Sequence, residues 1–353
     1  MSLRIKYQRL MVKNFTILNG LDNVPDELKN CVLTIGNFDG CHLGHQRIFL
    51  SALSIANSQT AGVSGSGAKR PTATEKIKTP VLALTFEPHP RDVFAKEPFM
   101  FRLTVGEQKA RALKAFGFDG IIIMPFDKDL ASLEAREFVQ KYFLDALDIK
   151  AIVVGEDFHF GKNRSGTPEF LAHCGSECGF EVHQLNLLEN GHASVSSSRI
   201  REALSEGQLD VANSLLGYHW IVEGEVITGD KRGRELGYPT ANFVLADNSN
   251  LAQGVYAARV KLGERLFDGI ASFGKPMFEN SQPPFEVHIF DFDEDIYGQH
   301  IEVALIKHIR GQMVFDGLDE LIVQMDKDSA KAKIALANVK PLSKLDEQLG
   351  FII

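Results

Sequence analysis

Short apolar runs that alternate with segments of helical periodicity are the feature of this sequence that most constrains its fold. A strand that is apolar along its whole length is buried on both faces, which is typical of a parallel sheet covered by helices. The first half of the chain is therefore predicted to be an α/β domain with a doubly wound parallel sheet. The strands are expected over Val32–Ile35, Val81–Phe86, Ile121–Met124, Ala151–Val154 and 181–185.

Helix boundaries in this half are marked by capping residues. Thr104–Glu107 has the spacing of a capping box and predicts a helix that ends near Gly117. Thr167 and Pro168 are typical N-cap and first-turn residues, and Gly179 is typical of a helix end. These signals place helices between the predicted strands.

The second half of the chain, from Tyr218 onward, changes to short strands separated by turn residues. In the segment Phe285–Phe290, Glu286 and His288 alternate with apolar residues and so share one face. Six such strands predict a small closed β-barrel, followed by an amphipathic helix over 318–325. The strands are expected over 219–228, 240–246, 254–262, 265–273, 284–293 and 299–309.

The length of 353 residues suits two domains of ordinary size. We expect an α/β domain over 12–205, a linker over 206–217 and a β-barrel domain over 218–343. The stretch 59–80 is rich in Ser, Gly, Ala, Thr and Lys, and it is predicted to be a surface loop inserted into the first domain.

Charge and apolar content exclude several classes of protein. The chain has 38 Lys and Arg against 46 Asp and Glu, a formal net charge of −8. This balance argues against broad binding to nucleic acid or to an anionic membrane. No stretch approaches the roughly 20 apolar residues of a membrane span, and the N-terminus lacks the apolar core of a signal peptide. Four cysteines do not make a disulfide framework, so we expect a cytoplasmic protein with reduced thiols.

The segment Gly36–His45, with the sequence Gly-Asn-Phe-Asp-Gly-Cys-His-Leu-Gly-His, lies between the first predicted strand and the first predicted helix. A doubly wound fold opens its ligand crevice at such a place, and a helix N-terminus offers N–H donors to phosphate. His42 and His45 would stabilise the charge that develops on an α-phosphate under attack. This predicts a nucleotidyl-transfer site; the alternative is a glycine-rich turn with two incidental histidines.

Ser196–Arg201, with the sequence Ser-Ser-Ser-Arg-Ile-Arg, is a second candidate for the same site. Its hydroxyls could simply cap a helix. In the functional interpretation, Arg199 or Arg201 holds the β- and γ-phosphates, because a guanidinium group matches phosphate geometry. The residues expected to contact the nucleotide are Gly36, Phe38, Asp39, Gly40, Gly44, Ser197, Ser198, Arg199 and Arg201.

A different constellation lies in the predicted barrel. Gly229–Asn242 contains glycines and basic residues that suit a flap over phosphates. Thr240 and Asn242 are two apart on a strand, and their side-chain oxygens suit Mg²⁺. Glu286 is the candidate general base for a hydroxyl that attacks a γ-phosphorus. The alternatives are that the glycine-rich basic segment is an exposed turn and that the Glu286 carboxylate faces solvent. Phosphate contacts are expected from Gly229, Lys231, Gly233, Arg234, Pro239 and Thr240.

Two other patterns do not support a site. Gly62 and Gly67 have the spacing of a phosphate loop, but Ala68 stands where the lysine would be. Cys174 and Cys178 are one helical turn apart without the second pair that a zinc site needs, so core thiols are expected.

The motifs together resemble the prokaryotic bifunctional riboflavin kinase/FAD synthetases, whose adenylyltransferase module belongs to the wider HxGH nucleotidyltransferase superfamily. The resemblance extends from about Phe15 to Lys340 in the family's order. Besides the motifs above, the matching segments are Phe86–Pro90, Pro125–Asp127, Val153–Gly161, Gly254–Ala257, Phe285–Gly298 and Arg310 with Phe315–Asp316. Two departures are that family members usually carry Asn at the position of Asp157 and more often Asp at that of Glu87.

The resemblance implies a cytoplasmic enzyme that phosphorylates riboflavin to FMN and then adenylylates FMN to FAD, releasing pyrophosphate. It implies ATP with Mg²⁺, small-molecule substrates and no permanently bound prosthetic group. His42, His45 and Glu286 would be catalytic, Asp157 would lie near the nucleotide, and Thr240 and Asn242 would hold the metal. Flavin contacts would come from Phe86, Pro88, His89, Pro90, Phe126, Phe160 and Arg310.

Several alternative functions are weighed against this one. An adenylyltransferase for another substrate would not need the kinase-like barrel. A class I aminoacyl-tRNA synthetase shares the His-x-Gly-His logic, but this chain is acidic and has no Lys-Met-Ser-Lys-Ser string. A riboflavin kinase or flavin-binding protein with a decayed first site is the remaining alternative, and Asp157 is what motivates it.

Overall fold

The computed structural model describes residues 15–61, 78–95, 100–186, 188–190, 193–229, 237–246, 248–274 and 284–352. The chain forms two compact units. The first contains residues up to Met100 together with Thr104–Val195, and the second contains Phe101–Leu103 together with Ser196–Ile353. No helix among the described residues is long and apolar enough to cross a membrane.

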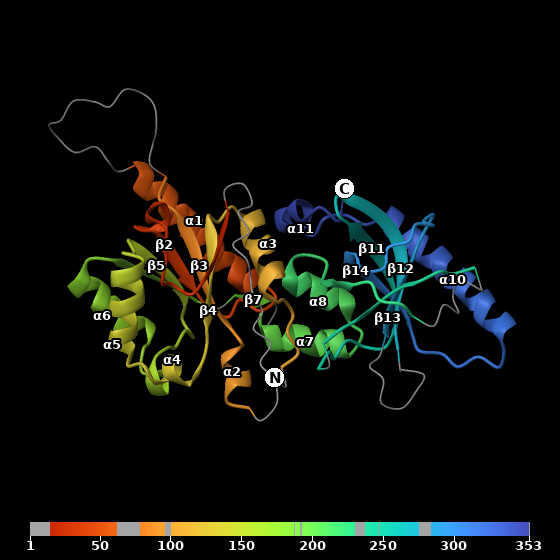
Figure 1. Ribbon diagram of the computed structural model, residues 1–353, viewed down its shortest axis with the longest axis horizontal. Coiled ribbons are helices and arrows are strands. Elements are labelled where there is room, and N and C mark those ends of the chain that lie inside the picture. Colours follow the sequence, from red (N-terminus) through yellow and green to blue (C-terminus); the bar gives the residue numbers. More distant parts are fainter. Residues whose placement is uncertain are drawn as a thin grey trace, which may run out of the picture. The chain divides into compact units, whose positions relative to one another are not determined.

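A six-stranded sheet forms the centre of the first unit (Figure 1), and all of its paired strands are parallel. The strands run in the order β1-β4-β3-β2-β5-β6. The five predicted strands are present, and prediction missed the four-residue β1 at the sheet's edge. The bounds are β1 (Thr16–Asn19), β2 (Val32–Ile35), β3 (Val81–Glu87), β4 (Gly120–Pro125), β5 (Ala151–Gly155) and β6 (Glu181–Leu185).

Alternate residues of the central strands enter two apolar cores on opposite faces of the sheet. Val32 and Val81 belong to one core, and their neighbours Leu33 and Leu82 belong to the other. The first core is closed by α1 (Leu43–Ala61) and α3 (Gly106–Phe116). The second is closed by α5 (Ala135–Phe138), which continues as the π-helical η2 (Val139–Ala146), and by α6 (Pro168–Cys178). The predicted double winding is thus confirmed.

Short elements complete the first unit, and one predicted helix start needs correction. The N-cap of α3 is Val105, and Gln108 accepts its backbone N–H, so the capping box predicted at Thr104 is wrong. Thr167 caps α6 as predicted. The remaining elements are η1 (Asp26–Leu28), α2 (Pro90–Val93), α4 (Lys128–Ser132), η3 (Lys162–Arg164), β7 (Glu189–Asn190) and β8 (Ala193–Ser194).

The second unit contains a six-stranded antiparallel sheet in the order β10-β13-β12-β11-β14-β9. A bridge between Ile227 and Asn242 brings the chain after β9 beside β10, so the sheet is nearly closed into the predicted barrel. The bounds are β9 (Ile221–Glu225), β10 (Ala241–Val244), β11 (Gly254–Leu262), β12 (Arg265–Phe273), β13 (Pro284–Ile289) and β14 (His300–Gly311).

Along the described part of the second unit, two helices precede the barrel strands and two follow them. α7 (Ser197–Ser205) and α8 (Leu209–Leu216) precede β9, so the range 206–217 predicted as a linker contains a helix. The predicted C-terminal helix is α10 (Leu318–Ala337), and it is followed by α11 (Lys344–Leu349), which was not predicted.

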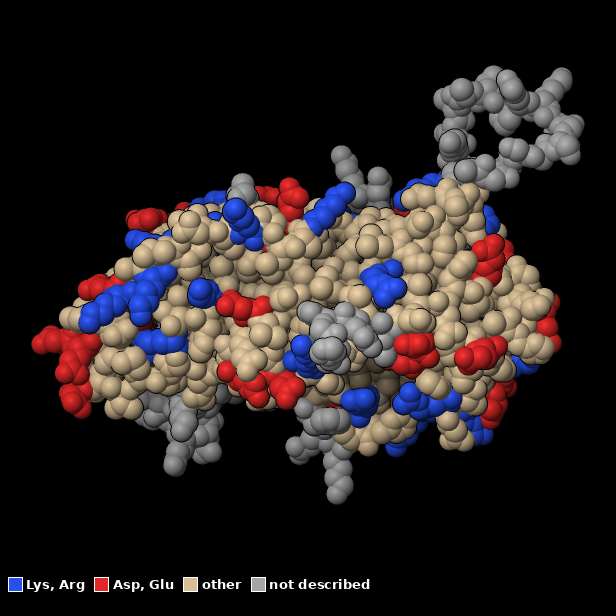
Figure 2. Space-filling view, turned by 180° about the vertical axis from the view of Figure 1, so that it is seen from behind, with Lys and Arg blue, Asp and Glu red and all other residues tan. Residues whose placement is uncertain are grey.

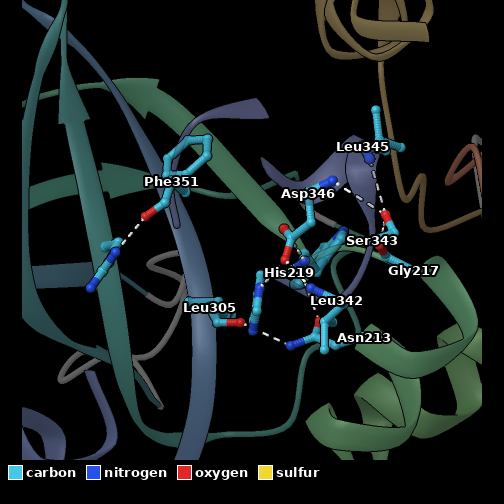
Figure 3. A network of polar contacts seen from close by, with 11 residues as sticks. Asn213, Gly217, His219, Leu305, Leu342, Ser343, Leu345, Asp346 and Phe351 are labelled. Atoms are coloured by element: carbon cyan, nitrogen blue, oxygen red, sulfur yellow. Dashed lines mark hydrogen bonds and ion pairs between the residues drawn. The ribbon is translucent and has the colours of Figure 1, made fainter. Parts of the chain in front are cut away.

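A buried polar network ties α11 to the start of the barrel (Figure 3). The Asp346 carboxylate lies 2.8 Å from His219 Nδ1 and accepts the backbone N–H groups of His219 and Leu342. Ser343 donates its hydroxyl to the Gly217 carbonyl and caps α11. The contacts of Asp346 with His219 and of Ser343 with Gly217 join residues more than 120 positions apart in the sequence.

Candidate functional site

The predicted motifs of the first unit lie at one edge of its sheet. Because the strands are parallel, their carboxyl ends share that edge. The order of the strands reverses between β2 and β5: β3 and β4 lie on one side of β2, and β5 and β6 lie on the other. Gly36–His45 follows β2 and Asp157 follows β5, so these two motifs flank the point at which open α/β sheets bind ligands.

The loop over 36–45 begins tightly against the sheet. The Gly36 N–H donates to the Leu84 carbonyl over 3.0 Å, and the Cys41 N–H donates to the Phe38 carbonyl over 3.1 Å. Gly40 has a φ of 84°, a conformation that favours glycine. The Phe38 ring is buried and meets the Phe49 ring edge-on, with centroids 5.0 Å apart. Phe38 thus anchors the loop in the core.

Thr104 holds the middle of this loop from the segment that precedes α3. Its backbone N–H donates to Asp39 Oδ1 over 3.0 Å, and its Oγ1 accepts the Gly40 N–H over 2.9 Å. Both contacts are buried, so the turn at Asp39 and Gly40 is fixed before any ligand arrives. Sequence reasoning assigned Thr104 to a helix cap and missed this contact.

The two histidines of the motif stack on each other at the start of α1. Their ring centroids are 3.7 Å apart at an interplanar angle of 17°, and His42 Nδ1 accepts the His45 backbone N–H. A Cβ at Gly44 would lie 3.1 Å from His42 Cε1, so the glycine makes room for this arrangement. His45 Nδ1 is enclosed and has no hydrogen-bond partner among the described residues.

The surroundings keep the His45 imidazole uncharged. Enclosure of the ring, then the neighbouring His42 and then the Lys109 ammonium hold the pKa of His45 well below its ordinary value. A neutral imidazole can donate one hydrogen bond to a phosphate oxygen without changing its own charge. The arrangement therefore suits a fixed donor better than a titrating acid.

Lys109 lies behind this loop, and the prediction did not include it. It is fully buried on α3, and its Nζ donates to Thr85 Oγ1 over 3.1 Å and to Glu87 Oε1 over 3.2 Å. Thr85 Oγ1 in turn donates to the Asn37 carbonyl over 3.1 Å. The sequence contained a signal for a buried lysine, because Lys109 lies on the same helix as the core residues Ala110 and Leu113 and next to them in the helical pattern.

Some of the predicted flavin contacts of the first unit lie where β3 and β4 end, and another belongs to the apolar core. Phe86 is buried and meets the Phe126 ring edge-on at 5.5 Å, where β3 and β4 end. His89 Nδ1 accepts the Arg91 N–H and caps α2. Phe160 is buried and meets the Phe138 ring at 5.5 Å, so it belongs to the core.

Asp157 is exposed on the turn that follows β5. A Cβ at Gly155 would lie only 2.9 Å from Asp157 Oδ1, so the glycine lets the carboxylate fold back over the strand end. The sequence therefore places a negative charge at the edge of the sheet where the nucleotide is expected.

The Ser196–Arg201 motif belongs to the second unit. Ser196 caps α7 by accepting the Arg199 N–H, so its structural role is confirmed. Ser197, Ser198 and Arg199 occupy the first turn of α7, and Arg201 lies one position after the buried Ile200. That these residues act together with His42 and His45 stays a prediction.

A line of paired residues crosses the barrel and carries the second candidate site. Asn242 on β10 is opposite Glu286 on β13, and Glu286 is opposite Ser272 on β12. The pairing continues through Val255 on β11 to Arg310 on β14. Paired residues share a face of a sheet, so Asn242, Glu286, Ser272 and Arg310 line one face.

This face is opposite to the aromatic core of the barrel. Phe243 and Phe285, which alternate with Asn242 and Glu286, are buried, and their ring centroids lie 4.9 Å apart. Arg310 donates from Nε to the buried Asp328 carboxylate of α10 over 2.7 Å. The predicted flavin contact Arg310 is therefore fixed by a buried ion pair.

Several predicted phosphate-site residues gather beside Glu286. Asn242 Nδ2 donates to the Thr240 carbonyl over 3.1 Å, and the Pro239 carbonyl is 2.8 Å from His288 Nδ1. A Cβ at Gly229 would lie 2.6 Å from Asn242 Nδ2, so the backbone there approaches closely. The predicted contacts Lys231, Gly233 and Arg234 lie outside the described residues.

The cysteines and metal-ligating residues add no further site among the described residues. All four cysteines are unbonded; Cys174 is buried in the core as expected, whereas Cys178 is exposed. No group of three or more His, Cys, Asp or Glu side chains capable of holding a metal is present in the part of the chain that the structure describes.

Comparisons with known proteins cover nearly the whole chain. The FAD synthetase family model matches residues 24–199, and the riboflavin kinase family model matches residues 216–336. The bifunctional riboflavin kinase/FMN adenylyltransferase of Escherichia coli K12 is 36% identical over 326 residues, which cover 92% of this chain and 98% of that protein. The protein of the same name from Haemophilus influenzae is 35% identical over 320 residues, which cover 90% of this chain and 98% of that protein.

A solved structure is similar over the same extent. It is the crystal structure of a Streptococcus pneumoniae protein named a macrolide-efflux protein, with a TM-score of 0.76 and 30% sequence identity. The similarity covers 93% of this chain and 100% of that one, so both units have counterparts in a single solved chain.

Proposed function

The chain belongs to the family of bifunctional riboflavin kinase/FMN adenylyltransferases, and on that premise we propose how its residues divide the two reactions between its two units. The enzyme transfers the γ-phosphoryl group of ATP to riboflavin to give FMN, and joins FMN to the AMP part of ATP to give FAD and pyrophosphate. The alternative of a single activity with a decayed first site is not supported, because the bifunctional relatives align over almost their entire length.

We assign adenylyl transfer to the loop over 36–45. The observation that carries this assignment is the stacked pair of His42 and His45 at the N-terminus of α1. An FMN phosphate oxygen attacks the α-phosphorus of ATP, the new P–O bond forms, and the bond to the β-phosphate oxygen breaks to release pyrophosphate. The loop amides and the histidine N–H groups would stabilise the charge on the α-phosphate. Ser197, Ser198, Arg199 and Arg201 are proposed to hold the remaining phosphates.

We assign riboflavin phosphorylation to the face that carries Glu286. Its carboxylate would accept the proton of the riboflavin 5′-hydroxyl as that oxygen attacks the γ-phosphorus. Gly229, Pro239 and Thr240 are proposed to contact the phosphates from the adjacent segments. Lys231, Gly233 and Arg234 are proposed to do the same on sequence grounds.

The residues around Asn242 fit a magnesium ion held with ATP. The amide nitrogen of Asn242 donates to the Thr240 carbonyl and, over 3.4 Å, to the Thr240 hydroxyl oxygen. Asn242 Oδ1 is therefore the atom left to act as a ligand, together with the remaining lone pair of the Thr240 hydroxyl. Oxygen donors of this kind suit Mg²⁺. When bound, the ion would neutralise charge on the phosphates during transfer.

The functional domains are proposed to cover 12–205 and 218–343, with 206–217 between them. The support is that the two family models leave 200–215 unmatched between them. A cytoplasmic location is proposed because four cysteines do not make a disulfide framework, and small-molecule partners are proposed from the activities of the family. On the face shown in Figure 2, acidic and basic side chains are interspersed, which gives no continuous basic surface for nucleic acid there.

Product chromatography after incubation with riboflavin, ATP and Mg²⁺ tests this assignment. The wild type should form FAD, and His42→Ala should accumulate FMN without FAD. Glu286→Ala should form no FMN from riboflavin but should convert supplied FMN to FAD. Loss of both activities in either variant would refute two separate sites. Calorimetry with a non-hydrolysable ATP analogue, in the presence of flavin and Mg²⁺, is a second test, and binding of a single equivalent would refute them as well.

A further inference from the structure

A lysine with no exposed surface lies directly behind the adenylyl-transfer loop. The side chain of Lys109 is 0% exposed, whereas that of Glu87, its ion-pair partner, is 23% exposed. Burying an ammonium group costs free energy that an apolar side chain of similar length would not cost. A lysine at this position of α3 is therefore a poor choice for packing alone.

The contacts of Lys109 lead to the loop in two steps. Its Nζ binds Thr85 Oγ1, and the same hydroxyl donates to the carbonyl of Asn37. Asn37 is the second residue of the loop, directly after Gly36 at the end of β2. The ammonium group thus orients the threonine hydroxyl. Because Thr85 Oγ1 accepts a hydrogen bond from Lys109, its own proton points to the Asn37 carbonyl.

The same loop contains polar atoms that lack partners. Asn37 Oδ1 and His45 Nδ1 are both enclosed, and neither has a hydrogen-bond partner among the described residues. Buried polar groups are rarely left unpaired unless they serve a ligand or a water molecule. The contact from Thr85 fixes the backbone of one of these two residues.

The second contact of Lys109 concerns charge. Glu87 lies at the carboxyl end of β3, on the sheet edge where phosphates are expected to bind. The Lys109 ammonium lies 3.2 Å from its Oε1, so the pair presents little net charge to an incoming triphosphate. The field of the same ammonium reaches His45, where it favours the uncharged imidazole.

We propose that Lys109 is a positioning residue for adenylyl transfer, which holds the loop over 36–45 through Thr85 and neutralises Glu87 at the phosphate-binding edge. The proposal rests on the assignment of FAD formation to the first unit. Lys109 does not touch the reacting atoms; it acts through Thr85, Asn37 and Glu87.

Steady-state kinetics of FAD formation from FMN test this role. Lys109→Met should lower kcat by about 100-fold, with a smaller change in KM for FMN and ATP, because a misplaced loop weakens mainly the transition state. Thr85→Val, which removes only the hydroxyl, should lower kcat in the same direction. Lys109→Met/Thr85→Val should be no worse than Lys109→Met, because the Thr85 hydroxyl passes the effect of the ammonium group on to Asn37. Lys114→Met, at an exposed position of α3, is the matched control and should leave kcat unchanged.

Two further measurements separate this role from support of the fold. Phosphorylation of riboflavin should be unchanged in every variant. Lys109→Met/Glu87→Gln removes both charges of this ion pair, so its melting temperature should stay closer to that of the wild type than that of Lys109→Met does, while FAD formation stays slow. A wild-type kcat for FAD formation in Lys109→Met, in Thr85→Val or in Lys109→Met/Glu87→Gln would overturn the proposal. Failure of the wild type itself to form FAD would instead refute the proposed function.

Discussion

Asn242 and Glu286 stand directly opposite each other on adjacent antiparallel strands of the barrel. The pairing places the proposed metal ligand beside the proposed general base on one face of β10 and β13. A hydroxyl that approaches Glu286 would therefore meet phosphates held next to the same carboxylate. This register links the two halves of the kinase assignment, and it leads to the first prediction.

Glu286→Gln should lower the rate of FMN formation by about two to four orders of magnitude, because the amide cannot accept the hydroxyl proton. The rate of FAD formation from supplied FMN should not change. Both rates can be measured by chromatography of products in the same reaction. Glu264→Gln, in the exposed turn between β11 and β12, is the control and should keep both activities. Equal loss in the two variants would argue against a specific role for Glu286.

Acidification should destabilise the first unit through His45. Its pKa in the folded protein is well below 6.5, whereas the unfolded chain takes up the proton near that pH. The unfolded state therefore binds more protons, and the free energy of unfolding falls as the pH drops below about 6.5, by at most about 1.4 kcal/mol per pH unit.

Denaturant unfolding at pH 7.5 and 5.5, followed by circular dichroism, checks this prediction. His45→Gln cannot titrate at this position, so its stability should fall less than that of the wild type over the same interval. An identical fall in both proteins would mean that His45 is protonated in the folded state as readily as in the unfolded one.

Cys41 should resist alkylation in the native enzyme although it lies inside the nucleotide loop. Burial raises the pKa of its thiol to about 12, so almost no thiolate is present at neutral pH. Cys178 is exposed and should react first with iodoacetamide. Mass spectrometry of the peptides gives the order of modification. Alkylation of Cys41 as fast as that of Cys178 would show that the loop opens readily.

Asp346→Ala should destabilise the second unit by about 3 kcal/mol, because it leaves the buried donors of His219 and the part-buried N–H of Leu342 without their acceptor. Trp220 is the chain's single tryptophan and is buried next to His219, so its fluorescence reports the unfolding. Glu294→Gln removes an exposed ion pair with Arg265 and should cost less than about 1 kcal/mol. Equal losses in the two variants would contradict a special role for the buried network.

Chelation of magnesium should stop both reactions if the metal accompanies ATP in each unit. Excess EDTA should abolish formation of FMN and of FAD, and added Mg²⁺ should restore both. Asn242→Ala should raise the Mg²⁺ concentration required for FMN formation, without changing the requirement for FAD formation. An unchanged requirement for FMN formation would remove Asn242 from the proposed metal site.

The sequence by itself determined the class of the fold and the two principal motifs. Continuous apolar runs such as Val81–Phe86 indicate strands that are buried on both faces, and that property depends only on residues close together in the chain. Gly36–His45 was recognisable for the same reason, because a strand end, glycines and a helix start are local features. The alternation at Glu286 also identified its face correctly.

Only the tertiary structure decided which distant residues support these motifs. Periodicity tells which face a residue occupies but not which strand or helix lies against it. Thr104 reaches Asp39, the buried Lys109 forms an ion pair with the partly exposed Glu87, and Asp346 reaches His219, all across long separations in the sequence. These contacts depend on the order of the strands and on the docking of α3 and α11, which arise from packing of the whole unit and not from any local pattern.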